Sequence, residues 1–250
     1  MFPCAAGSGT EPAKATSKEE PLENALLNSA DYDAIRISIK VAVAATALSL
    51  PFGFVYAYLM TFFRFRGKLL LEVLVNLPLT LPPVVIGYLL LVVLGKNGFL
   101  APLLELLGVR LIFSWKAAVL ASALVGFPLL VRSIRISMAS IDLQLIHASR
   151  TLGAGWLDTL LTIILPLSRT GIVAGASLMF ARSLGEFGAT IIVAGNMPGV
   201  TQTIPLAIYD YASAPGGETA ALSLCGVAIA ISMLVLLVHE LLNKKLARRN

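Results

Sequence analysis

The chain has 250 residues, of which 57% are hydrophobic and only 13% charged. Soluble domains carry about 25% charged residues, so this composition excludes an ordinary soluble globule and predicts one membrane domain. The net charge of +5 does not indicate nucleic-acid binding, because the basic residues flank apolar segments, as they do in membrane proteins. Cys4 and Cys225 lie far apart in different settings, which favours neither a disulfide framework nor a metal site.

Residues 1–34 are polar, and we expect a largely disordered tail without a cleaved signal peptide. A membrane domain follows over residues 35–243, and residues 244–250 form a short basic tail. Five apolar stretches are long enough to cross a bilayer, which takes about 20 residues, and they predict an all-α, polytopic fold. The expected spans cover residues 37–60, 69–94, 117–136, 171–195 and 220–242.

The placement of basic residues predicts the orientation of these spans. The basic residues after the first and third spans and at the end of the chain are Arg64, Arg66, Lys68, Arg132, Arg135, Arg150, Arg169, Lys244, Lys245, Arg248 and Arg249. Residues 196–218, in contrast, contain no Lys or Arg. Basic loops face the cytoplasm, so we expect the N-terminus outside and the C-terminus inside.

The second span is interrupted by polar and proline residues, namely Asn76, Pro78, Pro82 and Pro83. Proline removes a backbone donor and clashes with the preceding turn, so a kink is expected. A kinked helix of this kind either lines an aqueous path or is bent for packing, and both interpretations stay open. Glu72, near the cytoplasmic end of this span, is expected to extend its carboxylate to the membrane surface.

Arg182 and Glu186 lie four residues apart in the fourth span, on one helix face. Ionisable groups at this depth are costly, so we expect the two side chains to pair inside the bundle. The pair either locks the packing of the helices or lines a translocation path.

Residues 141–167, between the third and fourth spans, are too polar to cross the membrane. Asp142 is a candidate N-cap, and Gly153 is expected to end the helix. The apolar stripe of this helix comprises Ile141, Leu145, Ala148 and Leu152. A second amphipathic segment covers residues 156–164, and Pro166 ends it or opens the next helix. Two short helices with an apolar stripe need a protein partner or a membrane surface.

This stretch resembles the EAA loop of ABC importer permeases. In that loop Glu-Ala-Ala, three residues and Gly are followed, nine residues later, by Ile-x-Leu-Pro. The matching residues are His147, Ala148, Ser149, Gly153, Ile163, Leu165 and Pro166. His147 replaces the usual Glu and Ser149 the second Ala, which weakens a charge contact at His147 and leaves the glycine geometry intact.

The segment LMFARSLGEFGATIIVAGNMPGVTQTIPLAIYDYA, residues 178–212, resembles molybdate permeases over its whole length. Its ARSLGEFGAT core is also similar to sulfate permeases, whereas TQTIPLAIY favours molybdate. The resemblance implies a type I ABC importer permease fold in the inner membrane and a homodimer. It also implies two cytoplasmic ATP-binding cassette subunits, which contact residues 141–167, and an external molybdate-binding protein.

The sequence lacks the motifs of an enzyme that would hydrolyse ATP. No GxxxxGK[ST] phosphate loop is present, so ATP and Mg²⁺ are expected on the partner subunit and no cofactor on this chain. His147 and His239 form no HExxH motif, and no GxSxG elbow occurs. We therefore expect a transport subunit. A sulfate or tungstate permease, a secondary transporter or channel without ATPase, and an intramembrane enzyme remain the alternatives.

Overall fold

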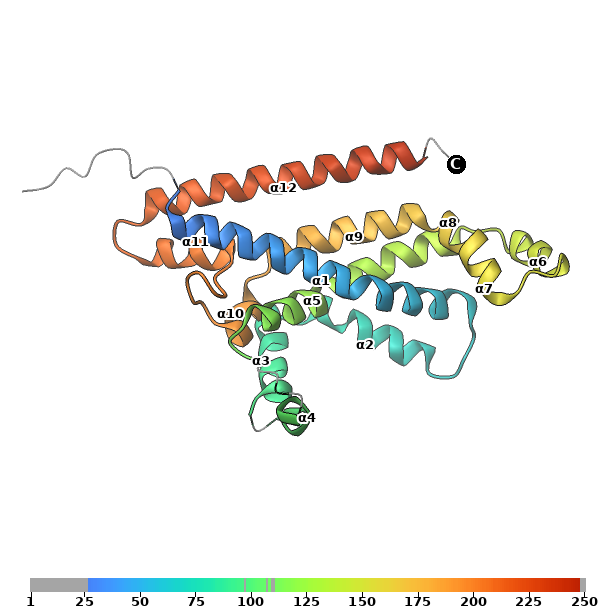
Figure 1. Ribbon diagram of the computed structural model, residues 1–250, viewed down its shortest axis with the longest axis horizontal. Coiled ribbons are helices and arrows are strands. Elements are labelled where there is room, and N and C mark those ends of the chain that lie inside the picture. The colour runs from blue at the N-terminus through green and yellow to red at the C-terminus, as the bar shows by residue number, and fades with distance from the viewer. Residues whose placement is uncertain (1–26, 97, 107, 109–110, 248–250) are drawn as a thin grey trace, which may run out of the picture.

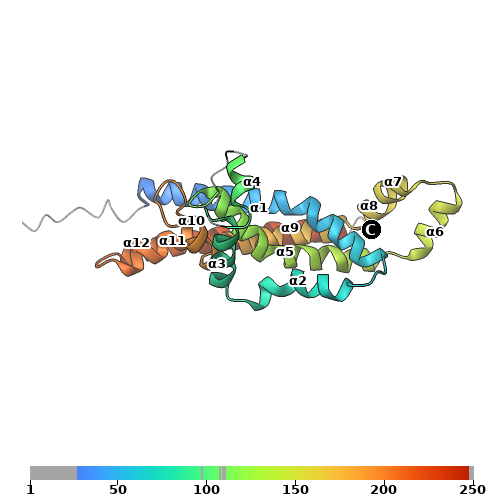
Figure 2. The ribbon, with the colours of Figure 1, turned by 90° about the horizontal axis from the view of Figure 1, so that it is seen from below.

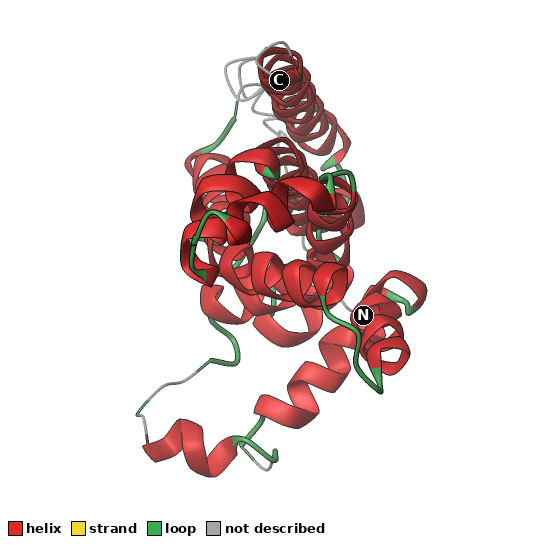
Figure 3. Cartoon of the chain, turned by 90° about the vertical axis from the view of Figure 1, so that its right-hand side faces the viewer, coloured by secondary structure: helices red, strands yellow, loops and turns green. Residues whose placement is uncertain are grey.

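The computed structural model describes residues 27–96, 98–106, 108 and 111–247. Within these ranges the chain forms only helices and loops, which confirms the all-α class (Figure 3). The elements in chain order are α1 (Ser29–Phe62), α2 (Lys68–Thr80), α3 (Pro83–Leu94), α4 (Ala101–Leu106), α5 (Trp115–Ala139), α6 (Leu143–Thr151), α7 (Trp156–Thr159), the π-helical turn η2 (Leu160–Ile164), α8 (Leu165–Leu167), α9 (Arg169–Leu184), α10 (Gly188–Ala194), α11 (Ile204–Ser213) and α12 (Glu218–Ala247).

Helix α5 is the centre of the bundle and packs against both α1 and α9, while α12 lies along the outside (Figure 1). The core between these helices includes Val41, Leu130, Ile134 and Met179. Small residues let α5 and α9 approach closely, as is common between membrane helices. A Cβ added to Gly175 would lie 2.9 Å from the carbonyl oxygen of Leu130, so the contact requires glycine.

Three helices are long and apolar enough to cross a membrane, namely α1, α5 and α12. Two bent pairs raise the number to five by length and composition if each counts as one span. In the first pair, α2 and α3, the helix direction bends by 116°. In the second, Trp156–Leu167 and Arg169–Leu184, it bends by 63°. Four of the five predicted spans therefore correspond to α1, the α2–α3 pair, α5 and α12, whereas the second bent pair covers Trp156–Leu184 and not the predicted fourth span, residues 171–195.

The break in the second span lies at Pro82 and Pro83. Leu81 precedes a proline and is extended, with ψ of 143°, so α2 stops at Thr80 and α3 restarts at Pro83. Pro78 lies inside α2 without ending it. Of the predicted kink residues, the adjacent pair of prolines therefore turns the chain.

The predicted fourth span, residues 171–195, is not one helix. Helix α9 ends at Leu184, three residues intervene, and α10 begins at Gly188. The Glu186 carboxylate accepts a hydrogen bond from the Ala189 amide at 2.9 Å, which satisfies one free donor at the start of α10. The sequence predicted that Arg182 and Glu186 share one helix. This is wrong, because Glu186 lies in the break between α9 and α10.

Both ends of the membrane domain reach further than expected. Helix α1 begins at Ser29, where the Asn28 amide donates to the Asp31 carboxylate at 2.8 Å, so residues 29–34 are helical. Its 34 residues span about 50 Å, more than the ~30 Å bilayer core. Helix α12 continues to Ala247, within the predicted basic tail. The rest of the two predicted tails, residues 1–26 and 248–250, lies outside the described residues.

The long helices bring the basic residues to one end of the bundle. Helices α1, α5 and α12 all finish there, so Arg64, Arg66, Arg132, Lys244 and Lys245 gather at what we term the basic end. Two views place α6 and α7 at this end and α10 and α11 at the opposite end (Figures 1 and 2). The molecule thus has two chemically different ends.

Candidate functional site

Helix α6 has a defined beginning and end, as the sequence predicted. Asp142 caps it by accepting a hydrogen bond from the Gln144 amide at 2.9 Å. At its end the Ala154 amide donates to the Ser149 carbonyl, and the Gly153 amide donates to the Arg150 carbonyl, each at 3.0 Å. Gly153 has φ of +88°, a left-handed conformation that glycine adopts without steric cost. The chain therefore turns sharply between α6 and α7.

The exposed face of α6 is apolar, although its stripe differs from the predicted one. Ile141 is buried in the core, whereas Leu145 and Ala148 are exposed and Leu152 is 88% exposed. Ile146 is instead the α6 residue that packs inward. We name Leu145, Ala148 and Leu152 the α6 face. An exposed apolar surface of this kind is typical of a protein contact.

The other residues of the predicted loop motif lie around this turn. His147 is exposed on α6, and the Ser149 hydroxyl lies 3.1 Å from that of Thr159, joining α6 to α7. Ile163 is half-buried in η2, and Leu165 and Pro166 are exposed in α8. Pro166 lies in the first turn of α8, which follows η2 directly and is separated from α9 by Ser168 and a 63° bend.

One side-chain hydrogen bond ties this loop to the bundle. The Trp156 indole nitrogen donates to the Tyr58 hydroxyl at 2.7 Å, and the two rings lie 6.3 Å apart. Tyr58 is buried near the end of α1, where it also contacts Phe62 and Phe63. Helix α7 is therefore joined to α1 by a side-chain contact.

Arg182 and Glu186 are brought together at the break between α9 and α10. Arg182 Nη1 lies 2.7 Å from Glu186 Oε2, as an ion pair without hydrogen-bond alignment. The Glu186 side chain is 2% exposed and that of Arg182 is 32% exposed. Glu186 is thus enclosed by protein and neutralised, while Arg182 still reaches an open surface.

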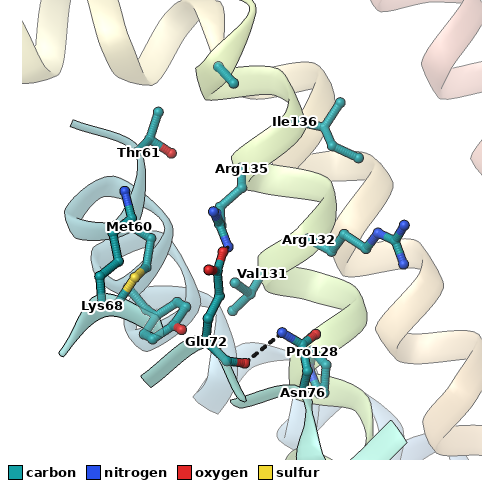
Figure 4. A pocket seen from close by; sticks show the side chains of 12 residues that line it. Met60, Thr61, Lys68, Glu72, Asn76, Pro128, Val131, Arg132, Arg135 and Ile136 are labelled. Carbon is teal, nitrogen blue, oxygen red and sulfur yellow. Dashed lines mark hydrogen bonds and ion pairs between the residues drawn. The ribbon is translucent and has the colours of Figure 1, made fainter. Parts of the chain in front are cut away.

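The sequence did not predict a second ion pair, which joins α2 to α5. Glu72 pairs with Arg135 Nη1 (Figure 4), rather than extending alone to the membrane surface. The Asn76 side-chain amide donates to the Glu72 backbone carbonyl at 2.7 Å, so its hydrogen bond stays within α2. The available signal was weak. Glu72 and Arg135 carry opposite charges and lie near the ends of two apolar segments, but they are 63 residues apart in the sequence.

The end opposite the basic end is tied by polar contacts between α1 and α11. The Tyr211 hydroxyl donates to Asp31 Oδ1 at 2.8 Å, and the Ile204 amide donates to the Ser38 hydroxyl at 2.8 Å. Burial, together with the hydrogen bond to Asp31, raises the pKa of Tyr211. The phenol therefore remains a neutral donor at physiological pH. Among the described residues no group of three His, Cys, Asp or Glu side chains could hold a metal ion.

The sequence of this chain is similar to those of known transport proteins. The family described as "Binding-protein-dependent transport system inner membrane component" matches residues 49–248. The chain is 48% identical over 216 residues to the molybdenum transport system permease protein ModB of Escherichia coli K12, covering 86% of this chain and 94% of that protein. It is 52% identical over 186 residues to ModB of Haemophilus influenzae, covering 74% and 81%.

The fold is also similar to that of a solved transporter. The MetNI methionine ABC transporter, in inward-facing conformations, matches with a TM-score of 0.65 and 16% identity. The match covers 88% of this chain and 99% of that one. At this identity the likeness concerns the fold alone.

Proposed function

The chain belongs to the family of binding-protein-dependent transport system inner membrane components, and we propose that it is the permease subunit of an ATP-driven molybdate importer. The relatives that are 48% and 52% identical carry the substrate assignment, because both are molybdenum transport permeases. The E. coli match extends over 94% of the relative. The α6 face supports an ATPase partner, since it presents exposed apolar side chains beside a fixed turn.

We propose that two copies of this chain form the membrane path. Two cytoplasmic ATP-binding subunits contact the α6 faces, and an external binding protein delivers the anion to the opposite end. ATP and Mg²⁺ bind to the partner subunit, because this sequence has no phosphate loop, and the chain itself needs no cofactor. Residues 196–218 contain no Lys or Arg, so anion selection resides in the binding protein.

The orientation in this proposal follows the charge distribution. The basic end lies in the cytoplasm and the end with α10 and α11 lies outside. Helix α1 runs from outside to inside, which puts the N-terminus outside, and α12 carries the C-terminus into the cytoplasm. The α6 face then meets the compartment that contains ATP.

Transport proceeds by alternating access. Closure of the ATP-binding subunits displaces α6 and α7, and Gly153 keeps the two helices at a fixed turn. Trp156 passes the displacement to α1 through Tyr58, and the α7–η2–α8 segment passes it to α9 across a 63° bend. Packed helices move between discrete arrangements, so the path opens at one end as it closes at the other. The Arg182–Glu186 pair, at a helix break, is a candidate for the part of the path that opens.

The substrate is tested by deleting the gene in its own organism. Uptake of radiolabelled molybdate at low concentration should fall to background, while sulfate uptake persists, and a plasmid copy should restore it. Loss of sulfate uptake with unchanged molybdate uptake would assign the chain to sulfate. Competition by unlabelled tungstate measures whether molybdate and tungstate are taken up by the same transporter.

A further inference from the structure

A cavity of about 610 Å³ lies between α1, α2 and α5 near the basic end. Its polar lining includes Tyr56, Lys68, Glu72, Asn76, Arg132 and Arg135. Helix α2 contacts α5, but none of its residues, all of which are described, is buried. Two polar contacts bridge the space around the cavity. They are the Glu72–Arg135 pair and a 3.0 Å hydrogen bond from the Tyr56 hydroxyl to the Leu71 carbonyl.

The charge around this cavity is positive. Its lining includes three basic residues, Lys68, Arg132 and Arg135, and one carboxylate, that of Glu72. In Figure 4 the Arg132 guanidinium points away from the Glu72–Arg135 pair, whereas the Lys68 and Arg135 side chains extend toward the same space from α2 and α5. Arg132 therefore contributes to the local potential without contacting the centre.

Lys68 and Arg135 both have donors to spare. Arg135 has five N–H donors, of which Nη1 contacts Glu72. Lys68 Nζ lies 3.4 Å from the Phe63 carbonyl, longer than the usual 2.7–3.2 Å, so this ammonium is weakly held. A guanidinium and an ammonium that line one cavity are donors of the kind that bind an oxyanion.

We propose that this cavity binds a tetrahedral oxyanion through Arg135 and Lys68, and that the Glu72 carboxylate competes with it for Arg135. Glu72 supplies a negative charge and oxygen acceptors, as the ligand would. The pair is only partly buried, with the Arg135 and Glu72 side chains 28% and 32% exposed, so water and ions reach it. The site thus exchanges an internal carboxylate for an external anion.

Two sources can supply this chemistry. One is the transported anion as it leaves at the cytoplasmic end, and this source rests on the proposed function. The other is the phosphate of an anionic phospholipid, since basic cavities between helices on the cytoplasmic side bind such headgroups. Leu69 and Leu70, next to Lys68, are 75% and 63% exposed and would contact the acyl chains.

Binding is measured on the permease purified with its ATP-binding subunit. In one arm, equilibrium dialysis of radiolabelled molybdate uses nanodiscs of phosphatidylcholine. In the other, native mass spectrometry titrates phosphatidylglycerol onto the delipidated assembly. Arg135→Gln and Lys68→Gln should each weaken binding about tenfold, because each removes a charge-assisted hydrogen bond, and Glu72→Gln should tighten it about threefold or more. A purely structural ion pair would not give opposite signs for Glu72 and Arg135.

Matched controls come from the exposed pair Lys244–Glu240, whose Nζ and Oε1 atoms are 3.4 Å apart. Lys244→Gln and Glu240→Gln remove the same charges at the same end of the molecule and should leave binding unchanged. If a variant of the Glu72–Arg135 pair does not assemble, Lys68→Gln carries the test, because it breaks no ion pair within the described residues.

The two arms identify the source. A response to molybdate alone assigns the site to the free anion, a response to phosphatidylglycerol alone assigns it to the headgroup, and a response in both shows that it accepts either. If the three variants bind both probes like the parent, the site is wrong. Uptake by the parent assembly is measured in parallel. If the parent takes up molybdate but the variants bind both probes as the parent does, only the proposed site is refuted. If the parent takes up no molybdate, the proposed function is refuted, and phosphatidylglycerol binding then tests the site.

Discussion

Two ion pairs join charged residues within this bundle, and the two pairs differ in how far apart their members lie in the sequence. Arg182 and Glu186 are four residues apart, so their pairing follows from spacing even though a helix break separates them. Glu72 and Arg135 lie 63 residues apart, and only the packing of α2 beside α5 joins them. Glu186 is nearly fully buried, which makes an unpaired charge there costly. Substitutions in the two pairs should therefore differ in how much they lower the stability of the protein.

Removing both members of the Arg182–Glu186 pair should destabilise the protein by less than the two single substitutions added together. Arg182→Gln and Glu186→Gln should each cost roughly 1–3 kcal/mol, since each leaves a charge without its partner. The double variant should cost less than the sum of the two. Thermal unfolding of the purified protein measures the cycle. Simple additivity would show that the two side chains do not interact.

Substituting Gly153 should impair coupling without affecting insertion. A Cβ there meets no atom within 4 Å, so any penalty comes from the left-handed backbone, about 1–2 kcal/mol and more for a β-branched residue. Gly153→Val should reach the membrane in normal amount yet lose uptake and co-purification of the ATP-binding subunit.

Gly155 provides the matched control for this substitution. Its φ of −68° suits any residue, and an added Cβ would meet only the Asp158 carboxylate, at 3.5 Å. Gly155→Val should therefore co-purify with the ATP-binding subunit and transport like the parent. Equal behaviour of the two valine variants would remove Gly153 from the coupling mechanism.

At the scale of elements, the α6–α7 loop is attached to the bundle at two places. It continues into α9 through η2 and α8, and Trp156 fastens it to the end of α1. The sequence pattern predicted two short helices and a glycine turn, because caps and periodicity are local signals. It could not predict the attachment to α1, since the two residues are 98 positions apart.

Loss of the Trp156–Tyr58 hydrogen bond should lower the number of anions transported per ATP. Tyr58→Phe and Trp156→Phe both retain an aromatic ring and remove a bond worth about 0.5–1.5 kcal/mol. The double variant should resemble either single one. Molybdate uptake and ATP hydrolysis, measured together, give the ratio. Tyr32→Phe, on an exposed residue of the same helix, is the control. An unchanged ratio in both single variants would exclude transmission through this contact.

At the scale of the whole molecule, the length of the apolar segments predicted the three long helices α1, α5 and α12 but not where the other helices break. The segment from Gly171 to Gly195 reads as one span because GEFGATIIVAG remains apolar. The break at Gly185 depends on Glu186 pairing with Arg182 and accepting the Ala189 amide, which are contacts of the folded chain. The prolines of the second span were visible in the sequence, whereas the 116° angle was not.

The two ends of the molecule should differ in access from outside the cell. In a background without Cys4 and Cys225, a cysteine replacing the exposed Ser213 should react with an impermeant maleimide in intact cells. A cysteine replacing the exposed Ser140, beside α6, should react only after permeabilisation. The reverse pattern would invert the proposed orientation.

The central claim is that this chain provides the path for ATP-driven, binding-protein-dependent uptake of molybdate. The permease and its ATP-binding subunit are reconstituted in vesicles with ATP inside, and the binding protein is added outside with radiolabelled molybdate. Accumulation above the external concentration should require ATP, the binding protein and the permease together, and Gly153→Val should abolish it. Equal uptake by the permease alone, driven by an imposed ion gradient without ATP, would contradict the account.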